Sequence, residues 1–333
     1  MHRVVTIVER YPQLSETYIS TETTALARAG FLASLVALRS ANYPLSEFEP
    51  FSLLEDEDEI VGACLTADAT VLHTHYLHMA PLVARIAERS GLPFTVRTHS
   101  YDVLKASAET LRELCALING SNCLGVLSFP FICERLAGYG LREDFLIESW
   151  PVIDYRRFLD KGPNGEGVLN LGAALDKKNM TGYVDFAATK PGTRFSLYAV
   201  GYRSADLIAY NAQLGSPVDI HPPVQPADMP QVYKEHSWLL YSASIDLNTV
   251  GWPMAVAEAQ ASGVGVCLQS KRDDAAAYLG GAGVVFVDFG EVADLVSGPV
   301  PEAMRERGFG VAAQCDVATH VQQLVELWST RRY

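Results

Sequence analysis

Residues 251–263 read GWPMAVAEAQASG, and this stretch decides the predicted fold. An apolar run precedes it at 238–241, and a second apolar run follows it at 264–268. We expect Pro253 in the first turn of a helix, where its missing N–H group costs nothing, and we expect Gly263 to end that helix. Strand, turn, helix and strand in this order predict a βαβ unit.

Glu258 is the charged residue within this predicted helix, where its neighbours are Ala257 and Ala259. A carboxylate in such surroundings has two interpretations, because buried carboxylates are rare unless a partner group binds them. Glu258 either faces solvent from a half-buried helix or binds a ligand, and the spacing alone leaves both open.

The composition restricts the classes of protein to which the chain can belong. With 333 residues, the chain is long enough for two domains. The net charge is −13, with 11 Lys and Arg against 19 Asp and Glu in the first 150 residues and 15 against 20 in the rest. Neither half therefore offers a basic footprint for nucleic acid or a polybasic patch for a lipid surface.

The cysteines and the N-terminus favour a cytoplasmic protein. Six cysteines without a CxxC pair fit buried thiols in a reducing compartment better than disulfides or a zinc site. The opening residues, MHRVVTIVERYPQ, lack the apolar core of a signal peptide, and no apolar run is long enough for a transmembrane segment.

Strand patterns alternate with helix patterns along the whole chain. In the first half we expect a loop at 9–14, a helix from about residue 17, a helix at 79–90, and strands at 4–8, 31–38, 69–73 and 93–97. In the second half we expect helices at 180–189, 207–214, 229–234 and 317–328, and strands at 168–171, 195–200, 218–221 and 238–241. This alternation predicts α/β architecture, with two doubly wound parallel-sheet domains that face a ligand cleft at the carboxyl ends of their strands.

The predicted domains are residues 1–150 and 151–316, and residues 317–333 form a terminal helix that returns toward the first domain. Residues 149–154 interrupt the periodicity, and KGPNGEG at 161–167 has the composition of a loop, so we expect the linker in this region.

Two groups of residues after strands of the first domain are candidates for ligand binding. Ser15, Glu16 and Thr17 either cap a helix or present its N-terminus to an anion or hydroxyl groups. His73, His75, His78 and His99 form the second group, but no cysteine or acid stands at a familiar zinc spacing, so we expect no metal. His99, followed by Asp102, either is structural or bonds a substrate hydroxyl or phosphate.

The second domain offers groups that suit a nucleotide. Gly172 begins a turn that ends in Lys177 and Lys178, which either are solvated or bind a phosphate. The turn is neither a Walker A loop nor a GxGxxG motif. Met254, Ala255 and Val256 would present N–H groups to an anion, and Glu258 could accept two vicinal hydroxyls, as acids do for ribose. Together these groups predict a nucleotide-diphosphate sugar as the ligand.

Five segments in the same order resemble the GT-B-fold retaining glycosyltransferases of family 4. YPQLSETYI at 11–19 is similar to the YPxxSETFI opening of many bacterial members. The segments at 73–103 and 150–158 resemble the H-x-H … G-x-P-x-x-x-T-x-H-x-x-D block and the interdomain N-G-V-D-x-x-x-F segment. LGAALDKKN is similar to the G-R-L-x-x-x-K-G donor loop, and GWPMAVAEAQASGVGV to the E-G-x-P-x-x-x-x-E-A-x-A-x-G-x-P-V signature.

The resemblance implies a GT-B fold and a metal-independent, retaining sugar transfer from a nucleotide-sugar to a sugar, lipid-linked or small-molecule acceptor, without a cofactor. It places His99 beside the transferred sugar, Lys178 on the diphosphate, Glu258 on the ribose and Gly201 near the base. The acceptor side would include Ser15 to Thr17, His75 and Asp102.

Two departures from the family pattern leave a second function open. Ala173 stands where the family has an arginine, and Val250 stands where it has the first of two glutamates. We expect Arg203 to replace the missing cation, and Asn248 or Thr249 to bond a sugar hydroxyl in place of the acid. The alternative is a catalytically weak homologue that binds a nucleotide-sugar or glycan or supports a partner subunit. A metal-dependent hydrolase built on the histidines is a third and weaker hypothesis.

Overall fold

The computed structural model describes residues 2–41, 48–201 and 203–330. The chain divides into two compact units. Unit 1 combines the chain up to Val152 with the segment from Val317 onward, and unit 2 runs from Ile153 to Asp316. Val152 lies next to the predicted boundary after residue 150, and the C-terminal helix belongs to unit 1.

Unit 1 contains a seven-stranded parallel sheet in the order β3-β2-β1-β4-β5-β6-β7. Most of its strands read as continuous apolar runs, because helices cover both faces of the sheet. The strands are β1 (Val4–Tyr11), β2 (Leu32–Ser40), β3 (Ser52–Leu53), β4 (Val71–His75), β5 (Phe94–Arg97), β6 (Cys123–Ser128) and β7 (Leu146–Glu148).

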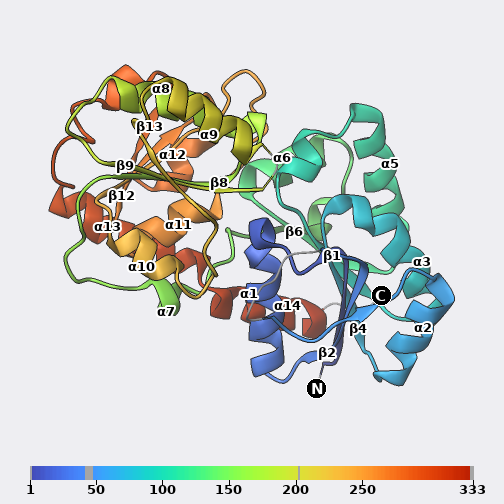
Figure 1. Ribbon diagram of the computed structural model, residues 1–333. Coiled ribbons are helices and arrows are strands. Elements are labelled where there is room, and N and C mark those ends of the chain that lie inside the picture. Colours follow the sequence, from blue (N-terminus) through green and yellow to red (C-terminus); the bar gives the residue numbers. More distant parts are fainter. Residues whose placement is uncertain (1, 42–47, 202, 331–333) are drawn as a thin grey trace. The chain divides into compact units, whose positions relative to one another are not determined.

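The helices of unit 1 cover its sheet on both faces. They are α1 (Thr17–Arg28), α2 (Glu57–Thr66), α3 (Ala80–Ser90), α4 (Tyr101–Leu104), α5 (Ala108–Asn119), α6 (Pro130–Gly138) and α14 (Val317–Thr330), with 3-10 turns at Leu14–Glu16, Leu77–Met79 and Glu143–Phe145. Figure 1 shows α1 and α14 together on one face of the sheet, with α2, α3 and α5 on the other. Buried Leu324 and Trp328 of α14 share an apolar cluster with Leu26 of α1 and Leu124 and Leu127 of β6.

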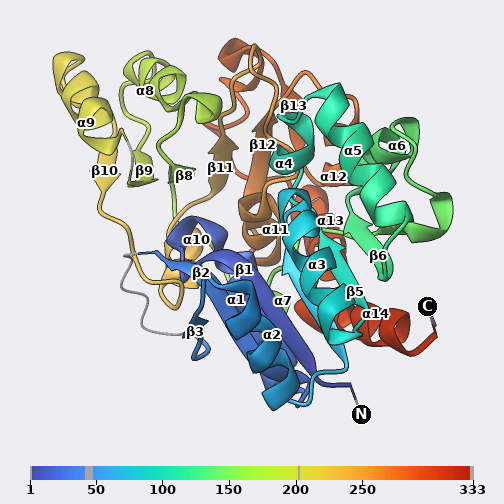
Figure 2. The same cartoon turned by 90° about the vertical axis from the view of Figure 1, so that its right-hand side faces the viewer.

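Unit 2 contains a six-stranded parallel sheet in the order β10-β9-β8-β11-β12-β13. Figure 2 shows these strands side by side in that order. They are β8 (Val168–Ala173), β9 (Phe195–Val200), β10 (Asp219–His221), β11 (Trp238–Tyr241), β12 (Gly265–Gln269) and β13 (Val284–Phe286).

The helices of unit 2 also lie on both faces, with α8 and α9 on one and α10, α11 and α13 on the other (Figure 1). They are α7 (Tyr155–Phe158), α8 (Met180–Ala188), α9 (Ser204–Gln213), α10 (Met229–Lys234), α11 (Met254–Ala261), α12 (Asp274–Leu279) and α13 (Glu302–Ala312), with 3-10 turns at Asp176–Lys178, Phe289–Val292 and Ala313–Cys315.

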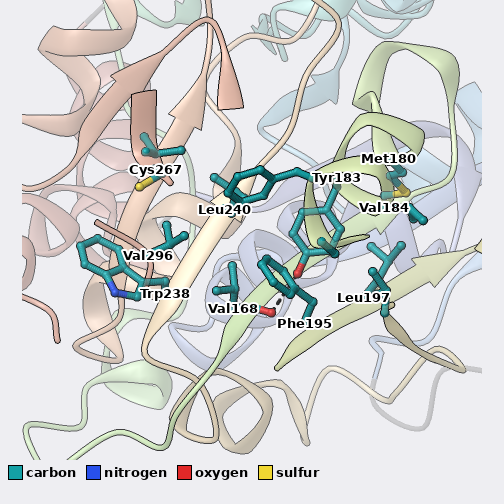
Figure 3. Close-up of a cluster of buried hydrophobic side chains, with 14 of the residues drawn as sticks. Val168, Met180, Tyr183, Val184, Phe195, Leu197, Trp238, Leu240, Cys267 and Val296 are labelled. Atoms are coloured by element: carbon teal, nitrogen blue, oxygen red, sulfur yellow. Dashed lines mark hydrogen bonds between the residues drawn. The ribbon is translucent and has the colours of Figure 1, made fainter. Parts of the chain in front are cut away.

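An apolar cluster fixes α8 against β8 and β9, as Figure 3 shows. Tyr183 of α8 is fully buried beside Phe195, and its hydroxyl donates to the carbonyl of Val168, 2.8 Å away. Because α8 follows the turn that ends β8, this cluster also determines where that turn lies.

Three local predictions are corrected by the structure. Strand β1 continues to Tyr11, so the loop expected at 9–14 is wrong in its first part: Arg10 and Tyr11 pair with β2 although the apolar pattern has ended. Helix α1 begins at Thr17 with Glu16 at its N-cap, and no side chain caps either α1 or the preceding 3-10 turn. Pro253 has extended backbone angles at the N-cap of α11, one position before the helix.

Gly263 ends the region of α11 with a φ of 73°, as predicted. The segment 161–167, expected near the linker, belongs to unit 2. It packs there because the Lys234 ammonium donates to the carbonyl of Gly162 at 2.8 Å. Among the described residues, none of the helices combines the length and the apolar character that crossing a bilayer requires.

Candidate functional site

The carboxyl ends of β4 and β5 bring the predicted histidines of unit 1 together. His75 is the last residue of β4, and His99 follows β5 by two residues. Because neighbouring parallel strands end at the same edge of a sheet, Nδ1 of His75 and Nε2 of His99 lie 2.9 Å apart. His78 is not part of this cluster, since it pairs at the surface with Glu9, 3.2 Å away.

Glu22 of α1 is the buried acid behind these histidines, and no sequence pattern singled it out. Its fully buried carboxylate lies 2.7 Å from Nε of Arg97, 2.8 Å from Nε2 of His73 and 3.3 Å from Nε2 of His75. Burial alone would raise the pKa of Glu22, but the opposing effects, of which the charge of the Arg97 guanidinium is the largest, hold this pKa well below its usual value. The cluster therefore contains a permanent buried anion.

His99 is held by contacts on several sides. Its ring stacks on Tyr18 with the ring centres 4.0 Å apart, and Tyr76 approaches it at 4.9 Å. Its backbone N–H donates to the carboxylate of Asp102, which also accepts from the N–H of Leu77 at 2.6 Å. Burial, and then the nearby His75, lower the pKa of His99 well below its usual value, so its ring is neutral at neutral pH.

The backbone beside both histidines adopts conformations that L-residues rarely take. Tyr76 follows His75 with φ 73° and ψ 134°, and Ser100 follows His99 with φ 65° and ψ −54°. Such conformations cost about 1–3 kcal/mol each and concentrate at functional sites. Two of them, each directly after one of the paired histidines, mark this edge of the sheet as a candidate site.

The remaining predicted residues of unit 1 lie nearby on the chain. Ser15 is exposed, Glu16 is partly buried, and Thr17 begins α1. Burial raises the pKa of Glu16 to about 7, although a hydrogen bond with Tyr76 opposes this rise. The hydroxyls of Tyr18 and Tyr76 are themselves in hydrogen-bond contact, so Glu16 connects through Tyr76 to the ring that stacks on His99.

Glu22, His73 and His75 are also the group of described residues that could hold a metal ion, since their ligand atoms all lie within 4.8 Å of one another. However, Arg97 already places a cation against the Glu22 carboxylate, and all three residues are fully buried. A divalent ion beside a guanidinium, with three ligands and no solvent, is electrostatically unfavourable. The residues fit a buried cluster of ion-pair contacts around Glu22 better than a metal centre.

In unit 2, the turn after β8 presents Lys178, whose side chain is partly buried. Its ammonium lies 4.4 Å from the centre of the Tyr241 ring, a cation–π contact. Burial, and then the charge of Lys177, lower the pKa of Lys178 to about 7. No carboxylate of a described residue lies within ion-pair distance of this ammonium, so none of the described acids serves as its counter-ion.

Gly172 lies directly beside this ammonium. Its φ of 135° is one that L side chains rarely adopt, and a Cβ built on it would lie 3.9 Å from the Lys178 nitrogen. Glycine therefore gives the turn its shape and leaves the backbone bare next to the cation.

Arg203, proposed to replace the family arginine, is held by two acids. Its guanidinium lies 2.7 Å from Asp176 and 3.1 Å from Asp206, with 63% of its side chain exposed. Asp176 begins the 3-10 turn that contains Lys178, so Arg203 ties the turn to α9. Gly201, two residues earlier, has a φ of 57° with open space at its Cβ position. Ala173, where the family has arginine, is 8% exposed.

Helix α11 places Glu258 inside unit 2. The residue is 8% exposed, and one carboxylate oxygen accepts a 2.7 Å hydrogen bond from the Tyr233 hydroxyl. Burial raises the pKa of Glu258 to about 7, against the opposing effects of the Tyr233 hydrogen bond and the charge of Arg157. The interpretation of Glu258 as a solvent-facing glutamate is therefore wrong.

The N-terminus of α11 offers fewer free N–H groups than predicted. The N–H of Val256 already donates to the carbonyl of Pro253 at 3.1 Å, so this predicted donor is not available to an anion. No side chain caps this helix. Val250 and Thr249 are partly buried in the loop before α11, and Asn248 is exposed there with a φ of 44°.

Sequence reasoning missed Glu22, Arg97, Tyr18, Tyr233 and Tyr241. One signal for Glu22 was available, because it lies at helical spacing between Ile19 and Leu26 on the apolar face of α1. Arg97 at the end of a buried strand was a second signal. The tyrosines carry no comparable pattern, since aromatic residues in strands and helices are usually core.

No model of a known protein family matches the chain, and no curated protein sequence matches it. Solved structures do match. The Anabaena protein HepE in complex with UDP has a TM-score of 0.79 and 14% identity, covering 99% of this chain and 100% of that chain. A sucrose-phosphate synthase from Thermosynechococcus elongatus has a TM-score of 0.75 and 15% identity, again covering 99% of this chain and 100% of that chain. A glycosyltransferase from Rickettsia africae has a TM-score of 0.73 and 12% identity, covering 98% of each chain.

These similarities establish the fold. The two parallel sheets of seven and six strands match the GT-B arrangement of these glycosyltransferases, and the predicted fold class is confirmed.

Proposed function

We propose that the protein is a glycosyltransferase that moves a sugar from a nucleoside-diphosphate sugar to an acceptor in glycan or glycosylated-metabolite synthesis. The observation that carries this proposal is Lys178, a partly buried lysine that follows the carboxyl end of β8 and has no carboxylate of a described residue within ion-pair distance. Ligands of open α/β sheets bind at that end. The fold supports the proposal, and HepE was solved with UDP, with UDP-glucose, and with UDP and glucose.

Lys178 is the proposed ligand of the diphosphate. A partly buried ammonium gains most from an anion that brings its own charge into the site, because no carboxylate of a described residue competes for it. As the bond to the sugar breaks, negative charge grows on the leaving phosphate, and a fixed cation stabilises that charge. The N-terminus of α11 would add the backbone N–H group of Ala255 without a metal ion.

Glu258 is the proposed ligand of the ribose. Tyr233 occupies one carboxylate oxygen, so the second oxygen is the one that would accept from a ribose hydroxyl. Gly172 and Gly201 would let the backbone approach the diphosphate and the base. Arg203 would act by holding the turn of Lys178 through Asp176.

In unit 1, His99 is proposed to contact the transferred sugar. Ser15, Glu16 and Thr17 lie on the segment that the resemblance assigns to the acceptor. His75 is completely buried, and the carboxylate of Asp102 holds backbone N–H groups of His99 and Leu77, so we propose that both support His99 and do not touch the acceptor themselves.

Retention of the anomeric configuration, independence from metals and a cytoplasmic location are part of the proposal through the resemblance. Retention is tested by NMR of the first product formed, because the anomeric coupling constant separates an axial from an equatorial bond. Metal independence is tested by turnover in excess chelator.

The second candidate is a binding protein with little turnover. It is favoured by Ala173 and Val250, which remove a cation and an acid that the family pattern places near the donor. Loss of one cation from a buried phosphate site costs about 1.5–3 kcal/mol unless another group replaces it.

A donor panel separates the two candidates. UDP-, GDP-, ADP- and TDP-sugars are first tested for binding by thermal shift, and the binder is then assayed for release of nucleoside diphosphate with candidate acceptors. Lys178→Ala should weaken binding by about 1.5–3 kcal/mol, or about 10- to 150-fold in Kd, and should lower the release of nucleoside diphosphate. Lys177→Ala removes an equal charge one residue away and should retain both. Saturable binding without release supports the second candidate, and equal losses in the two variants would contradict the role of Lys178.

A further inference from the structure

A continuous path of buried groups connects Glu22 to His99 through His75. The Glu22 carboxylate lies 3.3 Å from Nε2 of His75, and Nδ1 of His75 lies 2.9 Å from Nε2 of His99. Nδ1 of His99, at the far end, makes no hydrogen bond with any described residue. The path thus begins at a fixed charge and ends at an atom with no described partner.

The charge of Glu22 decides which nitrogen of His75 carries the proton. The contacts of Glu22 with His73 and His75 have the distances of ion pairs but not the alignment of straight hydrogen bonds, so the effect is that of the charge itself. A bare ring nitrogen facing a buried carboxylate would be repelled, whereas an N–H is attracted. Burial lowers the pKa of His75 to about 4, so the ring is neutral and has one proton, which lies on Nε2.

The same reasoning determines the state of His99. Nδ1 of His75 is bare and must accept, so His99 donates from Nε2. Because the ring of His99 is neutral, its other nitrogen, Nδ1, has no proton and is an acceptor. An acceptor nitrogen binds a hydroxyl group and repels a phosphate oxygen.

We propose that Glu22 and His75 are positioning residues that fix His99 in the Nε2–H tautomer, so that Nδ1 accepts a hydrogen bond from a hydroxyl of the bound sugar. This assignment decides between hydroxyl and phosphate as the ligand of His99. The identity of the hydroxyl donor as a sugar rests on the proposed function, whereas the tautomer does not.

The tautomer is measured on the full chain labelled with ¹⁵N-histidine, without substrate, by long-range ¹H–¹⁵N correlation at pH 7.5. The His99 signals are assigned by their loss in His99→Gln. We expect the shift of an unprotonated nitrogen at Nδ1 and of a protonated one at Nε2. A proton on Nδ1 in the wild type would overturn the proposal, whatever the outcome of the transferase assays.

Variants of His75 and His73, the two histidines that lie against Glu22, provide the matched comparison. His75→Leu removes the acceptor and should shift His99 toward the Nδ1–H tautomer. His75→Asn places a carboxamide oxygen near the former Nδ1 and should restore Nε2–H. His73→Leu loses the same kind of contact with Glu22 and should leave His99 unchanged. If His75→Leu does not fold, His75→Asn and the wild type decide, and an unchanged His99 tautomer in a folded His75→Leu contradicts the proposal.

Activity gives the last readout once a donor is known. Loss of one hydrogen bond to the sugar should lower kcat by about tenfold in His75→Leu, with recovery in His75→Asn. If turnover is absent in the wild type while the tautomer is as expected, the proposed function fails and the role of Glu22 and His75 stands.

Discussion

The hydroxyl of Tyr233 donates a 2.7 Å hydrogen bond to the carboxylate of Glu258 inside unit 2. The bond joins α10 to α11, and it offsets part of the free-energy cost of burying the Glu258 carboxylate. Because burial raises the pKa of Glu258 to about 7 and this bond lowers it, the pair keeps the acid close to half-ionised at neutral pH. A ligand with hydroxyl groups would favour the ionised form.

Glu258→Gln should weaken binding of the nucleotide-sugar at pH 8 by about 1.5–3 kcal/mol, or about 10- to 150-fold in Kd. The reason is that a neutral amide replaces a charged acceptor for the ribose hydroxyl. The measurement is isothermal titration calorimetry with the nucleotide-sugar that binds most tightly and with the free nucleobase of that nucleotide. Equal weakening toward the free base, which lacks ribose, would show that the pocket is distorted and would remove the ribose assignment.

Tyr233→Phe should have a smaller effect that depends on pH. Without the hydroxyl donor, the pKa of Glu258 rises further above 7, so donor affinity at pH 7 should fall and recover as the pH rises toward 9. The ring of Tyr233, which packs edge-to-face on Phe158 with centres 5.8 Å apart, is retained in the variant. Affinity that is lower by the same factor at every pH would contradict this linkage.

Lys178 should take up a proton when a diphosphate binds above neutral pH. Its pKa is about 7 in the unliganded protein, so it is mostly neutral at pH 8, and a bound anion raises that pKa. Titrations in two buffers of different ionisation enthalpy measure the protons exchanged. Glu258 titrates in the same range with the opposite sign, so the quantity to compare is wild type minus Lys178→Ala. We expect a difference of up to about one proton at pH 8 that diminishes toward pH 6. If the two proteins take up the same number of protons, Lys178 is not the ligand of the diphosphate.

Much of the fold could be predicted because buried parallel strands carry continuous apolar runs. The bounds of β9, α10 and β11 agree with the predictions at 195–200, 229–234 and 238–241. Prediction failed where hydrogen bonds continue beyond the apolar run, as at Arg10 and Tyr11, which pair with β2 although the run ends at Val8.

The candidate site was predictable to the extent that its residues stand in short motifs. Lys178 and Glu258 follow from local patterns, and the structure places Glu258 in a buried position and Lys178 in a partly buried one. Glu22 could not be paired with Arg97 from the sequence, because 74 residues separate them and only the packing of α1 against β4 and β5 brings them together. The ion pair of Glu22 and Arg97 therefore depends on tertiary structure and leaves no local pattern in the sequence.

The buried pair of Glu22 and Arg97 should be a major determinant of the stability of unit 1. Arg97→Met leaves an uncompensated carboxylate among buried groups, and breaking such a pair costs about 3–5 kcal/mol. The double variant Glu22→Gln with Arg97→Met removes the orphaned charge and should be more stable than Arg97→Met alone. Hydrogen–deuterium exchange of peptides from β4 and β5 measures the loss, with peptides of unit 2 as the internal reference.

The surface pair of Arg85 and Glu57, 2.6 Å apart with Arg85 54% exposed, is the matched control, and Arg85→Met should cost no more than about 1 kcal/mol. If the double variant is no more stable than Arg97→Met, the cost arises from lost packing of the arginine side chain, and the buried charge of Glu22 is not what Arg97 compensates.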